Sequence, residues 1–214
     1  MSKRAFIYAA GAHTYEDVSL YSRIKRNEDD LIICADGGYN LICEAGIKPD
    51  VIIGDMDSVS GKLPTDVKIY TYPCKKDKTD LHICVDFALK HKCDQIILLG
   101  VMGGRISHSM GSLMMLEYIY KNHAAGMILT ASTRVFLVSD KISVKRDNFK
   151  YLSLIPLTET AEGVSISGVK YPLENAVLKR ENNLGISNEF AADTAEISVK
   201  KGLLTVVCED MTAF

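Results

Sequence analysis

The stretch LIICADGGYNLICEAGIKPDVIIGDMDS, residues 31–58, carries the pattern that decides the fold. It contains two short apolar runs, 31–35 and 51–53, and each run ends in a group of Gly and Asp residues. Because these runs are apolar at every position, they suit strands that are covered on both faces, as in a parallel sheet. Similar apolar runs recur at 5–10, 96–99 and 127–129.

Two segments between these runs have the spacing of helices. In the segment 79–91, apolar residues recur on one helical face, and Asp77 or Thr79 could cap its start. The segment 109–120 is apolar nearly all round, which predicts a buried helix. Its three methionines are then expected in the core: Met110, Met114 and Met115. Strands that alternate with helices predict an open, mostly parallel α/β sheet with helices on both faces, over residues 1–130.

After about residue 130 the helical spacing stops. Short alternating segments take over: RVFLV, ISVKR, YLSLIPL, GVSIS, AVLK, AEISVKK and LLTVV. Turn-forming residues separate them, among them Gly163, Gly168 and Gly202. Several short strands at this spacing predict a second, small all-β domain over residues 131–214, an antiparallel sandwich or barrel.

Composition and charge exclude several classes of protein. The 214 residues contain 25 Lys and Arg against 27 Asp and Glu, a net charge of −2, and neither half is basic, which argues against a nucleic-acid partner. No apolar run approaches the roughly 20 residues that span a bilayer, so we expect no membrane segment. The six cysteines form no CxxC pair, so we expect a reduced, cytoplasmic protein without a zinc knuckle.

Acidic and glycine residues follow four of the expected strands. They are Asp36-Gly37-Gly38 after 31–35, Asp55 and Asp57 after 51–53, Asp77 and Asp80 after 69–72, and Gly103-Gly104-Arg105 after 96–99. Ligands of open α/β sheets bind beyond the carboxyl ends of the strands. We therefore expect the five aspartates to converge on one edge of the sheet, and we call these five residues the acidic edge.

The acidic edge predicts metal-assisted chemistry on a nucleotide phosphate. Oxygen-only clusters suit Mg²⁺, which takes its remaining ligands from water and from substrate phosphates. Glycine lets backbone N–H groups approach a phosphate chain, and Arg105 is the best candidate for bidentate phosphate contact. Further positive charge is expected from the lysines Lys75, Lys76 and Lys78. No GxxxxGK[ST] occurs, so the site is not a P-loop.

Each of these residues also has an ordinary structural interpretation. A single Asp after a strand is more often a helix cap or a turn residue than a ligand. His82 and His108 are more often surface or core histidines, and the lysine cluster could be a solvated loop. The repetition at four separate strand ends is what favours a common site.

Six motifs, taken in order, resemble those of bacterial thiamine pyrophosphokinases. They are ADGG at 35–38, PDVIIGDMDS at 49–58, KDKTD at 76–80, GVMGGRISH at 100–108, SGVKYPL at 167–173 and GISNE at 185–189. The resemblance implies an α/β catalytic domain, a β-sandwich thiamine-binding domain and a homodimer with sites at the subunit interface. It also implies Mg²⁺-dependent transfer of the β,γ-pyrophosphoryl group of ATP to the thiamine hydroxyl, releasing AMP and thiamine diphosphate.

The same resemblance implies roles for individual residues. Metal ligands are expected at Asp55, Asp57, Asp77 and Asp80, and catalytic residues at Asp55, Asp57, Asp80 and Arg105. Nucleotide contacts are expected from Asp36, Gly37, Gly38, Lys78, Thr79, Gly103, Gly104, Ser107 and His108. Thiamine contacts are expected from Ser187 and Asn188, with Phe190 or Tyr171 stacking on the ring or simply packing in the core.

One residue departs from the family pattern. The family motif GGRxDH reads Gly103-Gly104-Arg105-Ile106-Ser107-His108 here, and Ser107 cannot contribute the carboxylate charge of the usual Asp. Two alternatives to the kinase therefore stay open on the sequence. One is a metal-dependent phosphoesterase that uses water as nucleophile, and the other is a thiamine or nucleotide sensor without catalysis.

Overall fold

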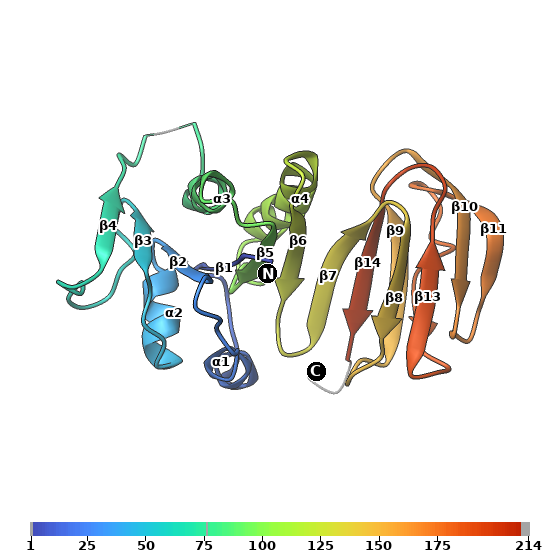
Figure 1. The fold of residues 1–214 in the computed structure, drawn as a ribbon, viewed down its shortest axis with the longest axis horizontal. Coiled ribbons are helices and arrows are strands. Elements are labelled where there is room, and N and C mark those ends of the chain that lie inside the picture. Colours follow the sequence, from blue (N-terminus) through green and yellow to red (C-terminus); the bar gives the residue numbers. More distant parts are fainter. Residues whose placement is uncertain (1, 76, 211–214) are drawn as a thin grey trace. The chain divides into compact units, whose positions relative to one another are not determined.

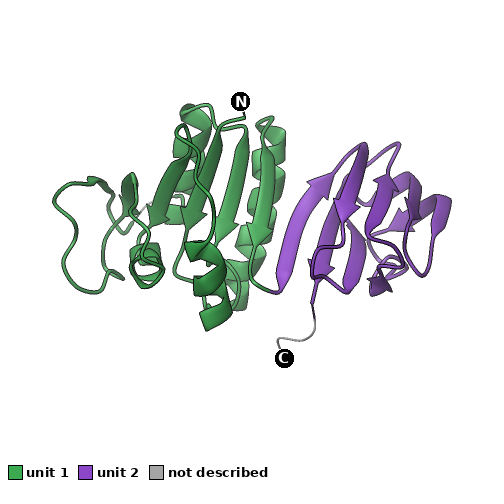
Figure 2. Cartoon of the chain, turned by 60° about the horizontal axis from the view of Figure 1, so that its bottom comes forward, with its two compact units in different colours: residues 1–131 green, residues 132–214 purple. Residues whose placement is uncertain are grey.

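The computed structural model describes residues 2–75 and 77–210. The chain divides into two compact units, Met1–Ala131 and Ser132–Phe214 (Figure 2). No helix in the described part of the chain is long and apolar enough to cross a membrane. The predicted combination of an open α/β sheet and a small all-β domain is confirmed.

The first unit contains a parallel sheet. Its strands are β1 Arg4–Tyr8, β2 Leu31–Ala35, β3 Val51–Gly54, β4 Lys68–Thr71, β5 Gln95–Leu99 and β6 Ala125–Leu129. They lie in the order β6-β5-β1-β2-β3-β4, and each neighbouring pair is parallel. The strands β1, β2, β3 and β5 are buried on both faces, and this explains why their residues are apolar at consecutive positions.

Four helices of the described residues cover this sheet. They are α1 Tyr15–Ser22, α2 Gly38–Glu44, α3 Asp80–Lys90 and α4 Ile106–Lys121. In Figure 1, α1 and α2 lie on one face and α3 and α4 on the other. The predicted helix at 79–91 is confirmed, and Thr79 rather than Asp77 is its N-cap, accepting a hydrogen bond from the backbone N–H of His82.

The predicted helix at 109–120 is present, but the prediction that it is buried is wrong. α4 begins earlier, at Ile106, and only Ser112, Leu116 and Ile119 are buried along it. Met110 and Met114, which were expected in the core, are 57% and 50% exposed, and Met115 is half-buried. The spacing of apolar residues shows on which sides of a helix they lie, but it does not show whether another part of the protein packs against each side.

The second unit contains antiparallel strands in two sheets. One sheet has β7 Thr133–Val138, β14 Leu204–Glu209, β9 Tyr151–Pro156 and β12 Asn188–Glu189 side by side, and the other has β8 Lys141–Lys145, β13 Thr194–Ser198, β10 Thr160–Ser167 and β11 Leu173–Lys179. All their pairings are antiparallel. The seven predicted segments are all strands, and β12 alone was not predicted, because a two-residue strand has no periodicity.

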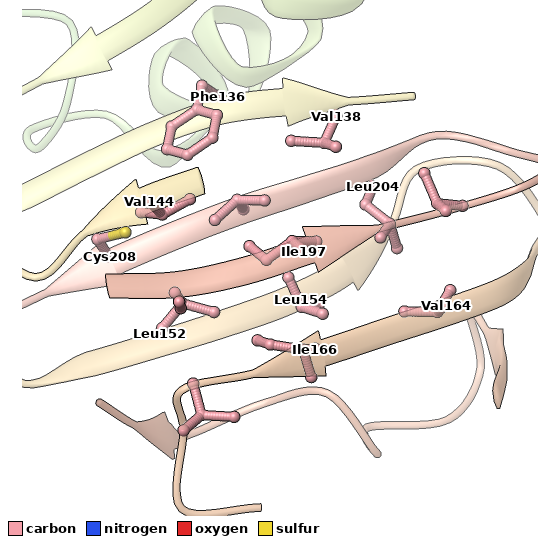
Figure 3. Close-up of a cluster of buried hydrophobic side chains, with 14 of the residues drawn as sticks. Phe136, Val138, Val144, Leu152, Leu154, Val164, Ile166, Ile197, Leu204 and Cys208 are labelled. Atoms are coloured by element: carbon pink, nitrogen blue, oxygen red, sulfur yellow. The ribbon is translucent and has the colours of Figure 1, made fainter. Parts of the chain in front are cut away.

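Alternate residues of these strands form one apolar core (Figure 3). Leu152 and Leu154 of one sheet and Val164, Ile166 and Ile197 of the other are fully or almost fully buried in it. Phe190 belongs to the same core, which matches its structural interpretation rather than the stacking one. Tyr171 is 60% exposed.

Candidate functional site

The carboxyl ends of the parallel strands form the edge at which a ligand is expected. The strand order reverses direction between β1 and β5, and such a point opens a crevice for ligands in α/β sheets. The segments after these two strands lie together, because the Ala9 N–H donates to Leu99 O over 2.9 Å and the Gly11 N–H to Gly100 O over 2.6 Å. A Cβ on Gly11 would lie 2.5 Å from Gly100 O, so only glycine fits there.

A buried tyrosine fixes the start of the glycine-rich segment 100–105. The Tyr21 hydroxyl donates to Leu129 O over 3.2 Å and accepts the Gly100 N–H over 3.3 Å. Burial raises the pKa of Tyr21, so the hydroxyl keeps its proton and its donor role. Gly103 and Gly104 follow with φ of +80° and +66°, which favour glycine and bring the backbone close to Ala12.

The predicted nucleotide motif at 36–38 lies on the same edge. Asp36 has φ of 47°, and its N–H donates to Ile53 O over 2.9 Å, which joins the end of β2 to the end of β3. A Cβ on Gly38 would lie 2.0 Å from Tyr8 O, so this glycine is required by the approach of α2 to β1. Within the described residues, Asp36 Oδ1 is buried and accepts no hydrogen bond. A buried carboxylate oxygen without a partner is costly and calls for a cation or a donor.

Three side chains converge just beyond β3. One donor atom each of Asp55, Asp57 and Cys74 lies within 4.8 Å of the others, with Asp55 half-buried and the other two exposed. The segment that holds the aspartates is fixed, because the Asp57 N–H donates to Asp55 Oδ1 over 3.4 Å and Ser58 Oγ donates to Asp57 Oδ1 over 2.8 Å. Asn40 of α2 adds a hydrogen bond to Ser58 O over 2.9 Å. We call Asp55, Asp57 and Cys74 the three-residue cluster.

Cys74 was missed by the sequence analysis. It follows β4, and only the parallel pairing of β3 with β4 brings it to the aspartates. Its hydrogen bond to Asp55 and the negative charges of Asp55 and Asp57 raise the pKa of the Cys74 thiol. The carboxylates thus hold the sulfur in its protonated form as long as no cation lies between them.

The remaining two aspartates of the acidic edge do not belong to this cluster. Asp80 occupies the first turn of α3, next to the cap Thr79. Asp77 lines a surface pocket of about 670 Å³ together with Tyr70, Tyr72 and Phe87. Of the five aspartates expected to converge, the structure therefore brings Asp55 and Asp57 into direct proximity, and Asp36 packs against Gly54, the residue before Asp55.

Lys78 forms an ion pair with Asp86 of α3. Its ammonium lies 2.5 Å from Asp86 Oδ2, and the Tyr118 hydroxyl donates to Asp86 Oδ1 over 2.7 Å. Burial alone would raise the pKa of Asp86, but these two hydrogen bonds outweigh it and lower that pKa. The His82 ring lies against Tyr118, and burial lowers the pKa of His82. The charged Lys78 side chain is thus held in place by Asp86, which Tyr118 in turn positions. Lys76, the other lysine of the motif, lies outside the described residues.

Arg105, Ser107 and His108 stand at the start of α4. Arg105 is the N-cap residue, its carbonyl accepts the His108 N–H over 3.0 Å, and all three side chains are exposed. The N-terminus of a helix favours anions, because its backbone N–H groups point outward. These side chains are therefore placed to meet a phosphate rather than to stabilise the core.

The residues expected to contact thiamine belong to the second unit. The Ser187 N–H donates to Ser153 Oγ over 3.0 Å, and Ser187 has φ of 61°. The Asn188 side chain accepts the Tyr171 N–H over 3.0 Å and donates to Tyr171 O over 2.7 Å. Lys170 lies 3.0 Å from Glu189 and lowers the pKa of that carboxyl. Asn188 therefore holds the segment around Tyr171 in place.

The donor set fits a divalent cation. Two carboxylates lie within reach of one ion at the three-residue cluster, and a third carboxylate, Asp36, has a buried oxygen that accepts no hydrogen bond in the described part of the chain. Mg²⁺ binds through one or two carboxylates and fills its shell with water and phosphate oxygens. Asp55 and Asp57 are thus the residues that would hold Mg²⁺.

Comparisons with known proteins point to one family. The family model described as "Thiamin pyrophosphokinase, catalytic domain" matches residues 24–128, and "Thiamin pyrophosphokinase, vitamin B1 binding domain" matches residues 139–204. A thiamine pyrophosphokinase of Bacillus subtilis is 29% identical over 188 residues, which are 85% of this chain and 88% of that protein.

Solved structures agree with these matches. The crystal structure of thiamine pyrophosphokinase from Bacillus subtilis has a TM-score of 0.86 at 26% identity and covers 98% of this chain and 100% of its own. That of thiamin pyrophosphokinase from Geobacillus thermodenitrificans has a TM-score of 0.81 at 26% identity and covers 99% of each chain. Similarity in sequence and in fold thus extends over both units.

Proposed function

The chain belongs to the thiamine pyrophosphokinase family and transfers the pyrophosphoryl group of ATP to the hydroxyl of thiamine, and we propose that the edge around Asp55 and Asp57 is where this transfer takes place. The observation that carries the proposal is the proximity of the Asp55 and Asp57 carboxylates to each other. Asp36, which packs against Gly54, adds an oxygen that is buried and accepts no hydrogen bond within the described residues. The products are AMP and thiamine diphosphate. Family membership does not favour the phosphoesterase or the sensor.

Transfer of this kind depends on positioning and on neutralising charge. Mg²⁺, when bound by Asp55 and Asp57, supplies positive charge to the phosphate oxygens. Arg105 and the backbone N–H groups of the segment 100–105 would hold the phosphate chain, and Lys78 would add a second cation. The thiamine hydroxyl then forms a bond to the β-phosphorus, in line with the bond to the α-phosphate. That bond breaks as AMP leaves, and the hydroxyl proton passes to solvent.

The second unit supplies the thiamine side of this proposal. Ser187 is held by Ser153, and Asn188 fixes the segment that carries the exposed ring of Tyr171. Three further expectations belong to the proposal: Mg²⁺ as the cation, a homodimer, and a cytoplasmic location as the cysteine pattern indicates.

A product assay tests the function. Purified protein is incubated with ATP, Mg²⁺ and thiamine, and AMP, ADP and thiamine diphosphate are separated. We expect AMP and thiamine diphosphate in equal amounts, both dependent on Mg²⁺. ADP or free phosphate without thiamine diphosphate would contradict the proposal in favour of a phosphoesterase.

Replacing Ser107 by Asp tests whether the family's missing carboxylate matters. Ser107 is exposed in the first turn of α4, where an acidic side chain is compatible with the helix dipole. Because Asp55 and Asp57 supply the metal carboxylates, we expect the kcat of Ser107→Asp to stay within a few-fold of the parent protein. A large gain in kcat would instead show that catalysis had decayed with the loss of this carboxylate.

A further inference from the structure

The three-residue cluster contains a sulfur donor, Cys74, besides its two carboxylates. Its Sγ and one oxygen each of Asp55 and Asp57 lie within 4.8 Å of one another, and Cys74 and Asp57 are exposed. A cation that arrives from solvent can therefore reach all three atoms. Of the six cysteines, Cys43 is also exposed, and the other four are buried.

A second feature beside the cluster also points to a positive ligand. Asp36 Cβ lies 2.7 Å from the place where a Cβ on Gly54 would stand, so Asp36 is packed against the residue before Asp55. Asp36 Oδ1 is buried and, among the residues described, accepts no hydrogen bond. A buried carboxylate oxygen without a hydrogen bond is costly and is stabilised by a positive ligand.

Sulfur changes which cations the site prefers. Mg²⁺ takes oxygen ligands, whereas thiolates select Zn²⁺ and softer ions, and Zn²⁺ accepts Cys and Asp in one tetrahedral shell. We propose that Asp55, Asp57 and Cys74 form a site for a thiophilic divalent cation, such as Zn²⁺ or Cd²⁺. On binding, the Cys74 S–H bond breaks, sulfur binds the cation, and the proton passes to solvent, so no oxidant or reductant is needed.

This site overlaps the edge at which Mg²⁺ is needed. A thiophilic ion at the cluster occupies the carboxylates Asp55 and Asp57, so it competes with Mg²⁺. The competition rests on the proposed function, whereas the contact between sulfur and cation does not. Cys74, to which the proposed transfer assigns no role, thereby makes the protein sensitive to soft metals.

The test is a Cd²⁺ titration of the full-length, untagged protein after treatment with a chelator, without ATP or thiamine. Cadmium bound to a thiolate absorbs in the ultraviolet, which reports the sulfur contact directly. Cys74→Ser is compared with Cys43→Ser, which removes the other exposed thiol from α2, and circular dichroism checks that both variants are folded. A further Cd²⁺ titration in excess Mg²⁺ measures the competition for the two carboxylates.

We expect the parent protein and Cys43→Ser to develop the absorption with a single equivalent of Cd²⁺, and excess Mg²⁺ to raise the Cd²⁺ concentration that gives half of the absorption. Cys74→Ser should lose the absorption and bind Cd²⁺ at least about tenfold more weakly, since even outer-shell partners contribute about 10- to 100-fold to metal affinity. Full absorption in Cys74→Ser, its loss in Cys43→Ser, or a half-maximal Cd²⁺ concentration that excess Mg²⁺ leaves unchanged would overturn the inference. Because no substrate is present, a protein that fails to make thiamine diphosphate can still pass this test.

Discussion

Replacing Asp55 by Asn is expected to lower kcat by about 100-fold or more, the range found when one preorganised electrostatic contact to the transition state is removed. Asn keeps the shape of the side chain and removes the charge that would hold Mg²⁺ beside Asp57. Because Asp55 is only half-buried, the fold should persist, with a free energy of unfolding close to that of the parent protein. Steady-state kinetics at saturating ATP, thiamine and Mg²⁺, together with thermal denaturation, give both quantities.

Asp66→Asn is the matched control for this substitution. Asp66 is exposed, precedes β4 at the opposite edge of the sheet, and forms an ion pair with the exposed Lys48. Its loss should leave kcat within a few-fold of the parent value. An Asp55→Asn enzyme as active as Asp66→Asn would remove Asp55 from the metal site.

Replacing Asp30 by Asn is expected to lower the free energy of unfolding by about 3 kcal/mol, as breaking a buried ion pair does. The Asp30 side chain is 1% exposed and accepts two hydrogen bonds of 3.1 Å from Arg4 Nε. It also accepts the Asn27 N–H over 2.7 Å, so it joins the segment before β2 to β1. Chemical denaturation measures the change. Asp29→Asn, at the exposed neighbouring position, should change stability by less than about 0.5 kcal/mol.

The effect of Asp30→Asn should depend on pH. Burial alone would raise the pKa of Asp30, but the hydrogen bonds from Arg4 and Asn27 outweigh it and hold the pKa below its usual value. The stabilisation is therefore fully present above the unfolded pKa of about 3.9 and is lost as the pH falls through the lower, folded value. The stability difference between parent and variant should shrink below about pH 4, and a constant difference down to low pH would contradict this assignment.

The fold of the first unit was predictable because its strands are apolar on both faces. β2 Leu31–Ala35 was predicted with its observed bounds, and β3 and β5 within one residue at each end. The error at α4 has a physical origin, since Ile106, Met110 and Met114 are apolar yet exposed. A pattern of residue types cannot distinguish a face that packs on a sheet from one that does not.

The site was predictable only in part. Strand ends place Asp55 and Asp57 on one edge, because the side chains that follow parallel strands must meet there. Cys74 could not be predicted, since nothing in its local sequence distinguishes it, and its position depends on how the chain after β4 returns to β3. The hydrogen bonds between Asn188 and Tyr171 could not be predicted from the sequence either, because they join a side chain to a backbone segment 17 residues away.

Following the phosphorus atoms of ATP tests the central claim most directly. The protein is incubated with thiamine, Mg²⁺ and ATP labelled at the β-phosphorus, and in a parallel reaction with ATP labelled at the γ-phosphorus. Transfer of the intact pyrophosphoryl group predicts that both labels enter thiamine diphosphate in equal yield, that AMP is unlabelled, and that no ADP accumulates. β-Label that remains in ADP, or γ-label released as free phosphate while thiamine stays unmodified, would contradict the account.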